Sequence, residues 1–115
     1  DERPNYTPAD IAHYTNLLKK MNIEHKLIID CSHGNSRKDH TQQLNVLANV
    51  LEQYQYGTEA IGGIMLESNL IAGNQNINNH PLTYGQSITD SCIDWEDTCL
   101  ALKQIHQSVL RRQSV

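Results

Sequence analysis

Short apolar runs alternate with longer segments of helical periodicity along this chain, and the alternation limits the folds that it can adopt. Residues 27–29 and 60–66 are apolar runs, and residues 87–93 form a third and weaker one. Segments with apolar residues at helical spacing precede the first run, separate the first two and follow the last. Strands that alternate with amphipathic helices are typical of α/β layers around a parallel sheet. The sequence therefore predicts an α/β fold.

Three segments carry the signals of amphipathic helices. The first begins at the capping sequence Thr7-Pro8-Ala9-Asp10 and ends at Lys19-Lys20, where cations stabilise the helix dipole. The second runs from Lys38 to Tyr54 and is stopped by Gly57. The third follows the capping residue Asp94 and ends at Arg111-Arg112. Its predicted apolar face consists of Trp95, Cys99, Leu102, Ile105 and Val109.

The predicted sheet is small. Three parallel strands leave two unpaired edges, which natural proteins avoid exposing. The continuous run at residues 27–29 is typical of a strand buried on both faces, and Gly62-Gly63 predicts close approach by a neighbouring element. The stretch from Ala72 to Gly85 is polar and without periodicity, which is typical of a functional or disordered loop. We expect part of a larger fold, and we interpret the opening at Asp1, which has no leader, as a cut in a longer chain.

Charge and hydropathy each argue against one kind of partner. The chain has 9 Lys and Arg against 13 Asp and Glu, a net charge of −4. Binding to nucleic acid requires a basic face, and the basic pairs Arg37-Lys38 and Arg111-Arg112 are expected to face solvent. No apolar run approaches the roughly 20 residues of a membrane helix. We therefore expect neither a nucleic-acid partner nor a membrane span.

The 3 cysteines, Cys31, Cys92 and Cys99, have no CxxC spacing. An odd number without paired spacing argues against a disulfide scaffold or a zinc knuckle. Reduced thiols are typical of a cytoplasmic protein, so we predict a cytoplasmic location. Cys31 lies beside the end of a predicted strand, and we expect it to be a small buried side chain.

One polar side chain stands at the C-terminal end of each predicted strand: His33, Glu67 and Asp90. Reactive groups gather at this edge of parallel sheets because the loops converge there. An imidazole with two carboxylates suits Mn, Fe, Co or Zn better than Ca. The alternative interpretation makes His33 and Asp90 turn-forming or capping residues and Glu67 a solvated carboxylate. The spacing alone leaves both interpretations open.

The remaining histidines are weaker candidates. Four lie on or beside predicted helices and are expected on the surface: His13, His25, His40 and His106. His80 lies in the long loop, where the neighbouring Pro81 predicts a simple turn. No Ser-His-Asp order, P-loop or GxGxxG motif is present in the sequence.

Three long blocks of the sequence resemble one enzyme family. They are IIDCSHGNSRKDH, AIGGIMLESNLIAGNQ and PLTYGQSITDSCIDWEDT. Together with PNY near the start, they resemble the C-terminal blocks of 3-deoxy-D-arabino-heptulosonate-7-phosphate (DAHP) synthase, of the microbial type found in enteric bacteria and yeast. The resemblance implies a (β/α)8 TIM barrel of about 250 residues. Residues 1–115 would supply its last three βα units, with no internal domain boundary.

The resemblance also implies a metal centre. His33 in the D-x-S-H block, Glu67 in the M-x-E-S block and Asp90 in S-I-T-D match the family's histidine, glutamate and aspartate ligands. The family's fourth ligand is a cysteine near the front of the barrel, and none of the cysteines here matches it. The implied cofactor is a divalent metal: Mn, Fe, Co or Zn. Asp90 is also a candidate catalytic residue, for proton transfer.

The implied reaction condenses phosphoenolpyruvate with erythrose 4-phosphate and water to give DAHP and phosphate, at the head of the shikimate pathway to aromatic amino acids. The metal would polarise the aldehyde so that C3 of phosphoenolpyruvate attacks it. In the family pattern, the lysines and arginines that hold the two phosphates lie upstream of Asp1, and so does most of the site for an aromatic amino acid inhibitor. We expect a homo-oligomer. The SHGN and PLTYGQSITD blocks favour the tryptophan-sensitive form.

Two alternatives stay open. On the first, these 115 residues are a non-catalytic fragment that associates with itself or with a complementary N-terminal piece and shows no turnover even with metal. On the second, the chain comes from the eight-carbon sugar-acid synthase that uses arabinose 5-phosphate. The LESNL and ITDSCIDW blocks argue against the second alternative, and phosphate release from arabinose 5-phosphate would support it.

Overall fold

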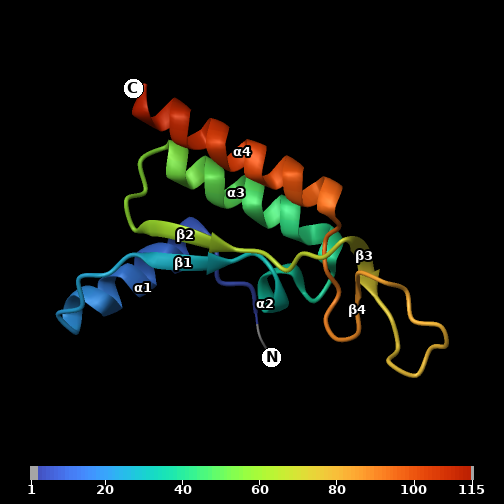
Figure 1. Cartoon of the computed structure of the whole chain (residues 1–115). Coiled ribbons are helices and arrows are strands. Elements are labelled where there is room, and N and C mark those ends of the chain that lie inside the picture. The colour runs from blue at the N-terminus through green and yellow to red at the C-terminus, as the bar shows by residue number, and fades with distance from the viewer. Residues whose placement is uncertain (1–2, 115) are drawn as a thin grey trace.

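Helices and strands alternate along most of the chain (Figure 1). The computed structural model describes residues 3–114, so Asp1, where the sequence suggests a cut, lies outside the described residues. In chain order the elements are α1 (Pro8–Lys20), β1 (Leu27–Asp30), α2 (His33–Ser36), η1 (His40–Gln42), α3 (Gln43–Gln55), β2 (Ile61–Met65), β3 (Ile71–Asn74), β4 (Gln86–Ser87) and α4 (Trp95–Gln113).

The first sheet pairs β1 with β2 in parallel, which confirms the predicted pairing. The pairing ends at Asp30, which lies opposite Met65. The chain passes from β1 to β2 through α3, since parallel strands need a crossover connection. A Cβ atom at Gly62 would lie 2.6 Å from Cβ of Lys26. The close approach predicted from the glycine pair therefore occurs at Gly62.

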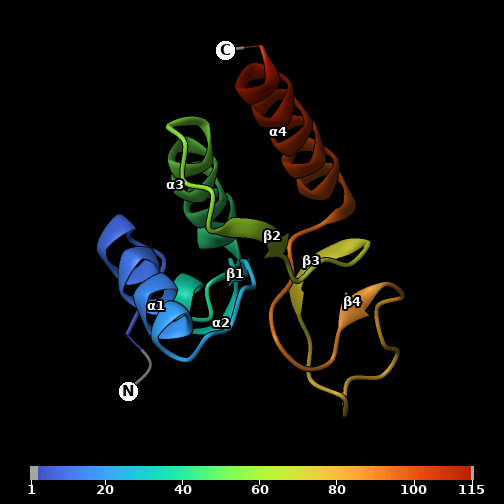
Figure 2. The same cartoon turned by 90° about the vertical axis from the view of Figure 1, so that its left-hand side faces the viewer.

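The buried core lies between the β1–β2 sheet and helices α1, α3 and α4 (Figures 1 and 2). Its buried residues are Ile11, Ile29, Cys31, Val46, Leu47, Val50, Leu51, Ile61 and Ala101. The side chain of Ile28 alternates to the opposite face of the sheet and is 73% exposed. The prediction that this strand is buried on both faces is therefore wrong within residues 3–114, because the helices cover one face only.

Helices α1 and α4 begin where the capping signals predict. Thr7 and Asp10 form a reciprocal capping box at the start of α1. The Asp94 carboxylate caps α4 by accepting the backbone N–H of Asp97 at 2.9 Å. Basic residues occupy the last turn of both helices, where they stabilise the helix dipole. Among residues 3–114, no helix combines the length and the apolar character needed to cross a membrane.

Helix α3 begins at Gln43 and not at the predicted Lys38. The short helix α2 and the 3-10 turn η1 precede it. Between them, Arg37 and Lys38 have φ angles of 54° and 60°, a left-handed conformation that a right-handed α-helix does not contain. The predicted helix began too early because the pattern of apolar residues contains no signal for this break.

The predicted apolar face of α4 is partly wrong. Trp95 and Leu102 are 58% and 54% exposed, whereas Ala101 is buried in the core that α4 shares with α3. Arg112 also turns toward α3. Its guanidinium donates to the backbone carbonyl of Tyr54 at 3.1 Å and stacks on the Tyr54 ring. Arg112 therefore does not simply face solvent as predicted.

Residues 69–90, called the amide lobe below, form an excursion between β2 and α4 (Figure 1). The lobe contains a second parallel pair, β3–β4, although the stretch from Ala72 was predicted to lack regular structure. The third predicted strand, residues 87–93, is mostly wrong. Of these residues, all described, Ser87 ends β4, Cys92 forms an isolated antiparallel bridge with Gly73, and Ile93 forms an isolated parallel bridge with Ser68. The chain bends between them, where the Ser87 hydroxyl accepts the N–H of Thr89 at 3.1 Å.

Candidate metal centre

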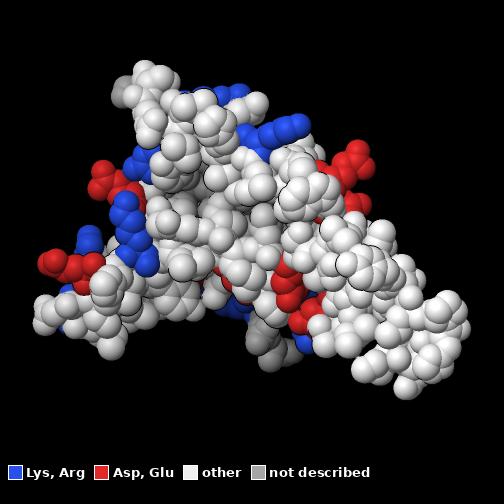
Figure 3. All heavy atoms as spheres, in the orientation of Figure 1, with Lys and Arg blue, Asp and Glu red and all other residues white. Residues whose placement is uncertain are grey.

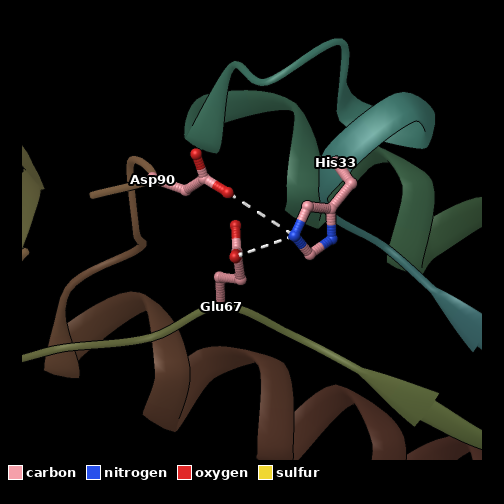
Figure 4. Close-up of side chains that lie close together, drawn as sticks. All are labelled: His33, Glu67 and Asp90. Carbon is pink, nitrogen blue, oxygen red and sulfur yellow. Dashed lines mark ion pairs between the residues drawn. The ribbon is translucent and has the colours of Figure 1, made fainter. Parts of the chain in front are cut away.

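His33, Glu67 and Asp90 meet at one point in the structure (Figure 4). His33 begins α2 just after β1, Glu67 follows β2, and Asp90 is the last residue of the amide lobe. Nε2 of His33 lies 3.2 Å from a carboxylate oxygen of Glu67 and 3.5 Å from one of Asp90. Figure 4 shows both carboxylates directed at this ring nitrogen. Three segments that are far apart in the sequence therefore converge, as expected for a shared ligand.

A third carboxylate, that of Asp30, orients the His33 ring from its other nitrogen. Nδ1 lies 2.8 Å from Oδ2 of Asp30, and the Asp30 carboxylate accepts the N–H and the hydroxyl of Ser32 at 2.8 and 2.6 Å. The bond to Asp30 favours a proton on Nδ1, which leaves Nε2 free to bind a cation. His33 has a φ of 46°, a conformation that costs about 1–3 kcal/mol for a residue other than glycine. This strained backbone directs the ring toward Glu67 and Asp90.

The charges around the site shift the pKa values of its members. The hydrogen bond with Asp30 raises the pKa of His33, and the charges of Glu67 and Asp90 add to the increase while burial opposes it. Burial raises the pKa of Glu67, opposed by the charge of His33 and aided by that of Asp90. Burial also acts to raise the pKa of Asp30, but the hydrogen bonds from Ser32 and His33 outweigh it and lower the value. The cluster therefore favours a bound cation, either a proton on His33 or a metal ion.

The donor atoms fit a divalent metal ion. One donor atom from each of His33, Glu67 and Asp90 lies within 4.8 Å of the others. Metal bonds of about 2.1 Å to nitrogen and oxygen place neighbouring donors roughly 3.0–3.4 Å apart. The separations from Nε2, 3.2 and 3.5 Å, are close to that range. A mixed nitrogen and oxygen set suits Mn, Fe, Co or Zn. His33 does begin a turn, as the alternative interpretation expects, while the convergence of the three side chains favours the metal interpretation.

No cysteine within the described residues joins this group. Cys31 is fully buried, as predicted, and burial together with the Asp30 charge raises the pKa of its thiol to about 12. Cys92 is half-buried, its thiol donates to the backbone carbonyl of Asp90 at 3.5 Å, and burial raises its pKa. Both thiols therefore favour the protonated form, in contrast to a metal-binding thiolate.

The other histidines lie outside the site. His13, His25 and His106 are exposed, as predicted for surface residues, and His80 in the amide lobe is exposed too. The same prediction is wrong for His40, which is half-buried and whose Nδ1 forms a hydrogen bond with the Ser91 hydroxyl. Because Ser91 directly follows Asp90, this bond ties η1 to the segment that carries the Asp90 carboxylate.

The surface around the site is open. A hollow of about 550 Å³ lies beside His33, with Arg3, Asn5 and Asn35 in its wall. Figure 3 shows acidic atoms exposed where the main body of the molecule meets the amide lobe. Asp90 is the one charged residue of the lobe. The hollow gives solvent access to His33, and the side chains of Glu67 and Asp90 are themselves 23% and 51% exposed.

Two supporting residues were not among the predicted site residues. Asp30 ends β1 three positions before His33, and this spacing is the signal for a carboxylate–histidine pair. Gln43 contacts the backbone of Glu67 from α3. Its signal is a polar residue one helical turn before Leu47, on the buried face of the helix.

Comparison with known proteins identifies a family for this chain. The model of the DAHP synthetase I family matches residues 1–103. The Trp-sensitive phospho-2-dehydro-3-deoxyheptonate aldolase of Enterobacter agglomerans is 40% identical over 112 residues, which are 96% of this chain and 32% of that protein. The Tyr-sensitive enzyme of Escherichia coli K12 is 42% identical over 108 residues, which are 92% of this chain and 30% of that protein.

A solved structure gives the same result. Phospho-2-dehydro-3-deoxyheptonate aldolase from Francisella tularensis SCHU S4 matches with a TM-score of 0.93 and 48% identity, over 96% of this chain and 32% of that one. The chain thus spans about a third of the length of the relatives that it matches. Since the family model covers most of its residues, the chain belongs to the DAHP synthetase I family.

Proposed function

We propose that this chain is the C-terminal part of a DAHP synthase. The whole enzyme would condense phosphoenolpyruvate with erythrose 4-phosphate and water to give DAHP and phosphate, the first step of the shikimate pathway. The observation that carries the proposal is the convergence of His33, Glu67 and Asp90 in a chain of this family. Enzymes built on (β/α)8 barrels place their reactive groups at the carboxyl ends of the strands, and His33 and Glu67 follow β1 and β2.

In this proposal, residues 1–115 form the last three βα units of a single (β/α)8 domain without an internal boundary. The parallel β1–β2 pair and the crossover through α3 support it. The bridge between Ser68 and Ile93 supports it too, because it pairs the chain after the amide lobe with the segment that follows β2. The uncovered sheet face that carries Ile28 would then face the inside of the barrel.

His33, Glu67 and Asp90 would hold one divalent ion, Mn, Fe, Co or Zn, with a cysteine from outside this chain as the fourth ligand. When bound, the ion supplies Lewis-acid polarisation of the erythrose 4-phosphate aldehyde. Asp30 holds the proton on Nδ1 of His33, so that the lone pair of Nε2 remains available to bind the metal ion. Glu67 and Asp90 balance the positive charge. Asp90 has the most exposed side chain of the three and is the candidate for proton transfer.

The substrates, the inhibitor and the assembly belong to the whole protein. The groups that hold both substrate phosphates, and most of the site for an aromatic amino acid inhibitor, are expected outside these 115 residues, so we expect the chain alone to be inactive. Relatives named Trp-, Tyr- and Phe-sensitive match at 40%, 42% and 42% identity. Sequence identity therefore does not distinguish the three inhibitor classes, and the tryptophan-sensitive form stays a prediction. We propose a homo-oligomer in the cytoplasm.

The reaction itself is the test, assayed with the protein expressed from its complete gene. With Mn²⁺, phosphoenolpyruvate and erythrose 4-phosphate, we expect equal amounts of DAHP and phosphate. Both should stop after chelation and resume when metal is added. His33→Ala should abolish turnover. His13→Ala removes an exposed histidine of α1 and is the matched control that should keep it.

Each alternative has its own outcome. Turnover that survives His33→Ala or complete chelation contradicts the proposed metal centre. Phosphate release with arabinose 5-phosphate, and none with erythrose 4-phosphate, would assign the eight-carbon sugar-acid synthase. If the complete protein with metal turns over neither substrate, the non-catalytic interpretation replaces the proposal.

A further inference from the structure

Gln43, the first residue of α3, places an uncharged amide in the interior of the molecule. Its exposure is 0%, and it is among the largest fully buried side chains of the described residues. A buried amide is costly unless its polar atoms are hydrogen-bonded. Both ends of this amide bond to one residue, Glu67, which lies 24 positions away. The sequence interval means that these bonds fix tertiary structure and do not stabilise the helix itself.

The two bonds hold the Glu67 backbone at both of its polar groups. The N–H of Glu67 donates to Oε1 of Gln43 at 2.9 Å, and Nε2 of Gln43 donates to the Glu67 carbonyl at 3.1 Å. The same carbonyl accepts the N–H of Ile93 at 3.0 Å. A backbone segment held in this way has little freedom to rotate, so the direction in which its side chain leaves is also set.

The Glu67 backbone bonds to Gln43 because the β1–β2 sheet ends before it reaches Glu67. The register of β1 with β2 stops at Asp30 and Met65, and the N–H of Cys31 makes the last bond, to the Met65 carbonyl at 2.9 Å. Beyond that point the chain turns away to form the strained backbone of His33. Glu67 therefore lies where β1 no longer offers it a strand neighbour. The Gln43 amide supplies a donor and an acceptor in place of that neighbour.

The consequence concerns the carboxylate. The side chain of Glu67 leaves the held backbone and reaches 3.2 Å from Nε2 of His33, with 23% of its surface exposed. Asp90, in contrast, has a side chain that is 51% exposed and comes from the amide lobe. Glu67 is thus the more firmly fixed of the two carboxylates, and Gln43 is the buried side chain that fixes it.

We propose that Gln43 is a positioning residue for the metal centre: its buried amide replaces a strand neighbour for Glu67 and holds that carboxylate toward Nε2 of His33. This inference rests on the proposed function, because it assumes that Glu67 binds the metal. Groups that orient metal ligands typically change metal affinity by about 10–100-fold when removed.

The test compares two variants of the protein expressed from its complete gene. Gln43→Met keeps the length of the side chain and removes both hydrogen bonds. Gln53→Met is the matched control, since Gln53 lies on the same helix, is 8% exposed, and donates to the backbone carbonyl of a distant residue, Tyr6, at 2.7 Å. Both variants lose buried amide bonds, but only the first affects Glu67.

Titration with Co²⁺, followed by its visible absorption, reports affinity and coordination without using activity. We expect Gln43→Met to weaken Co²⁺ binding by about 10–100-fold and to change the absorption bands, and Gln53→Met to stay within roughly twofold of the wild type. A Glu67→Ala variant shows the effect of losing the ligand itself. If Gln43→Met binds Co²⁺ like the wild type while Glu67→Ala does not, the inference is wrong and the proposed metal centre stands.

Two further results separate the remaining cases. If the wild type binds no Co²⁺, or if Glu67→Ala binds it unchanged, the proposed metal centre fails and the inference fails with it. If Gln43→Met does not fold, amide hydrogen exchange of the wild type decides. If the Gln43 amide holds the Glu67 backbone, the Glu67 N–H should be protected from exchange as strongly as the Cys31 N–H in the sheet. Exchange of the Glu67 N–H at the rate of an open loop overturns the inference.

Discussion

Two regions of this molecule are held together by different interactions. In the layered part, made of α1, β1, α3, β2 and α4, buried apolar side chains fill the space between the helices and the sheet. In the amide lobe, residues 69–90, all of which the structure describes, no residue is buried, and Ile77, Leu82 and Tyr84 are exposed. The lobe therefore depends on polar interactions for its shape.

Side-chain amides supply those interactions. Nε2 of Gln75 donates to the carbonyls of Thr83 and Gln86 at 2.8 and 3.1 Å, and its Oε1 accepts the N–H of Thr83 at 2.8 Å. Nε2 of Gln86 donates to the Ala72 carbonyl at 2.9 Å. Amides and hydroxyls that bond to backbone groups can fix a turn without any buried core.

The candidate metal centre lies where the two regions meet. The layered part contributes His33 and Glu67, and the lobe contributes Asp90. The comparison indicates that two ligands are held by a packed scaffold and one by a hydrogen-bonded excursion. The following changes, made in the complete protein, test that difference.

Removing a core side chain should have the largest effect on stability. Leu47 is fully buried in the layered part, and Leu47→Ala should lower the free energy of unfolding by about 2–5 kcal/mol through lost burial and a residual cavity. Leu82 is an exposed leucine of the lobe, and Leu82→Ala should change it by less than about 0.5 kcal/mol. Urea denaturation measures both values. Equal losses would contradict the contrast between the regions.

Removing a ligand from each region should weaken metal binding to different extents. His33 faces both carboxylates and is oriented by Asp30, so His33→Ala should lower the affinity for Mn²⁺ by more than the roughly 100-fold upper range for a supporting group. Asp90→Ala should lower it less, because that side chain is half exposed and comes from the lobe. Titration calorimetry measures both constants. The reverse order would show that the lobe, and not the packed scaffold, dominates the site.

Removing the central amide of the lobe should loosen it locally. Gln75→Ala deletes the bonds to Thr83 and Gln86, and the loss of about 1 kcal/mol of hydrogen bonding should speed exchange of the Thr83 N–H by roughly 5–10-fold. Exchange of the Leu47 N–H in α3 should not change. Hydrogen exchange followed by NMR or mass spectrometry resolves the two sites. Faster exchange at both would mean that the regions open as one unit.

Lowering the pH should have the smallest effect on stability, through the capping interaction at the start of α1. The Thr7 hydroxyl bond, aided by the charge of Arg3, holds the pKa of Asp10 below its usual value. A group whose pKa is lower in the folded state stabilises the fold above its unfolded pKa of about 3.9 and loses that contribution as the pH falls further. The unfolding midpoint of Asp10→Asn should therefore depend less on pH between about 5 and 3 than that of the wild type. Identical pH profiles would contradict the capping role.

The sequence was most informative where local chemistry decides the structure. The Thr7–Asp10 box and the Asp94 cap appear at the predicted helix starts because capping depends on neighbouring residues alone. The parallel pairing of β1 with β2 follows from the helix between them. The convergence of His33 and Glu67 could be predicted because both follow strands that pair in parallel. Asp90 lies inside the wrongly predicted strand 87–93, so only its match to a family block pointed to the site.

The errors have two sources. One is a local backbone conformation, the left-handed turn at Arg37 and Lys38, which has no signature in an apolar pattern. The other is interaction between distant residues. The β3–β4 pair of the lobe depends on Gln75 and Gln86, whose amides bond across the loop. Arg112 stacks on Tyr54 from another helix, which its position in a basic pair does not indicate.

The central claim is that side chains from both regions hold one metal ion. A crystal structure of the complete protein soaked in Mn²⁺, with anomalous scattering measured to locate the metal, tests it most directly. We expect one anomalous peak, about 2.0–2.2 Å from Nε2 of His33 and from carboxylate oxygens of Glu67 and Asp90. A protein that is active with Mn²⁺ but shows no peak there, or a peak bound by other residues, would contradict it.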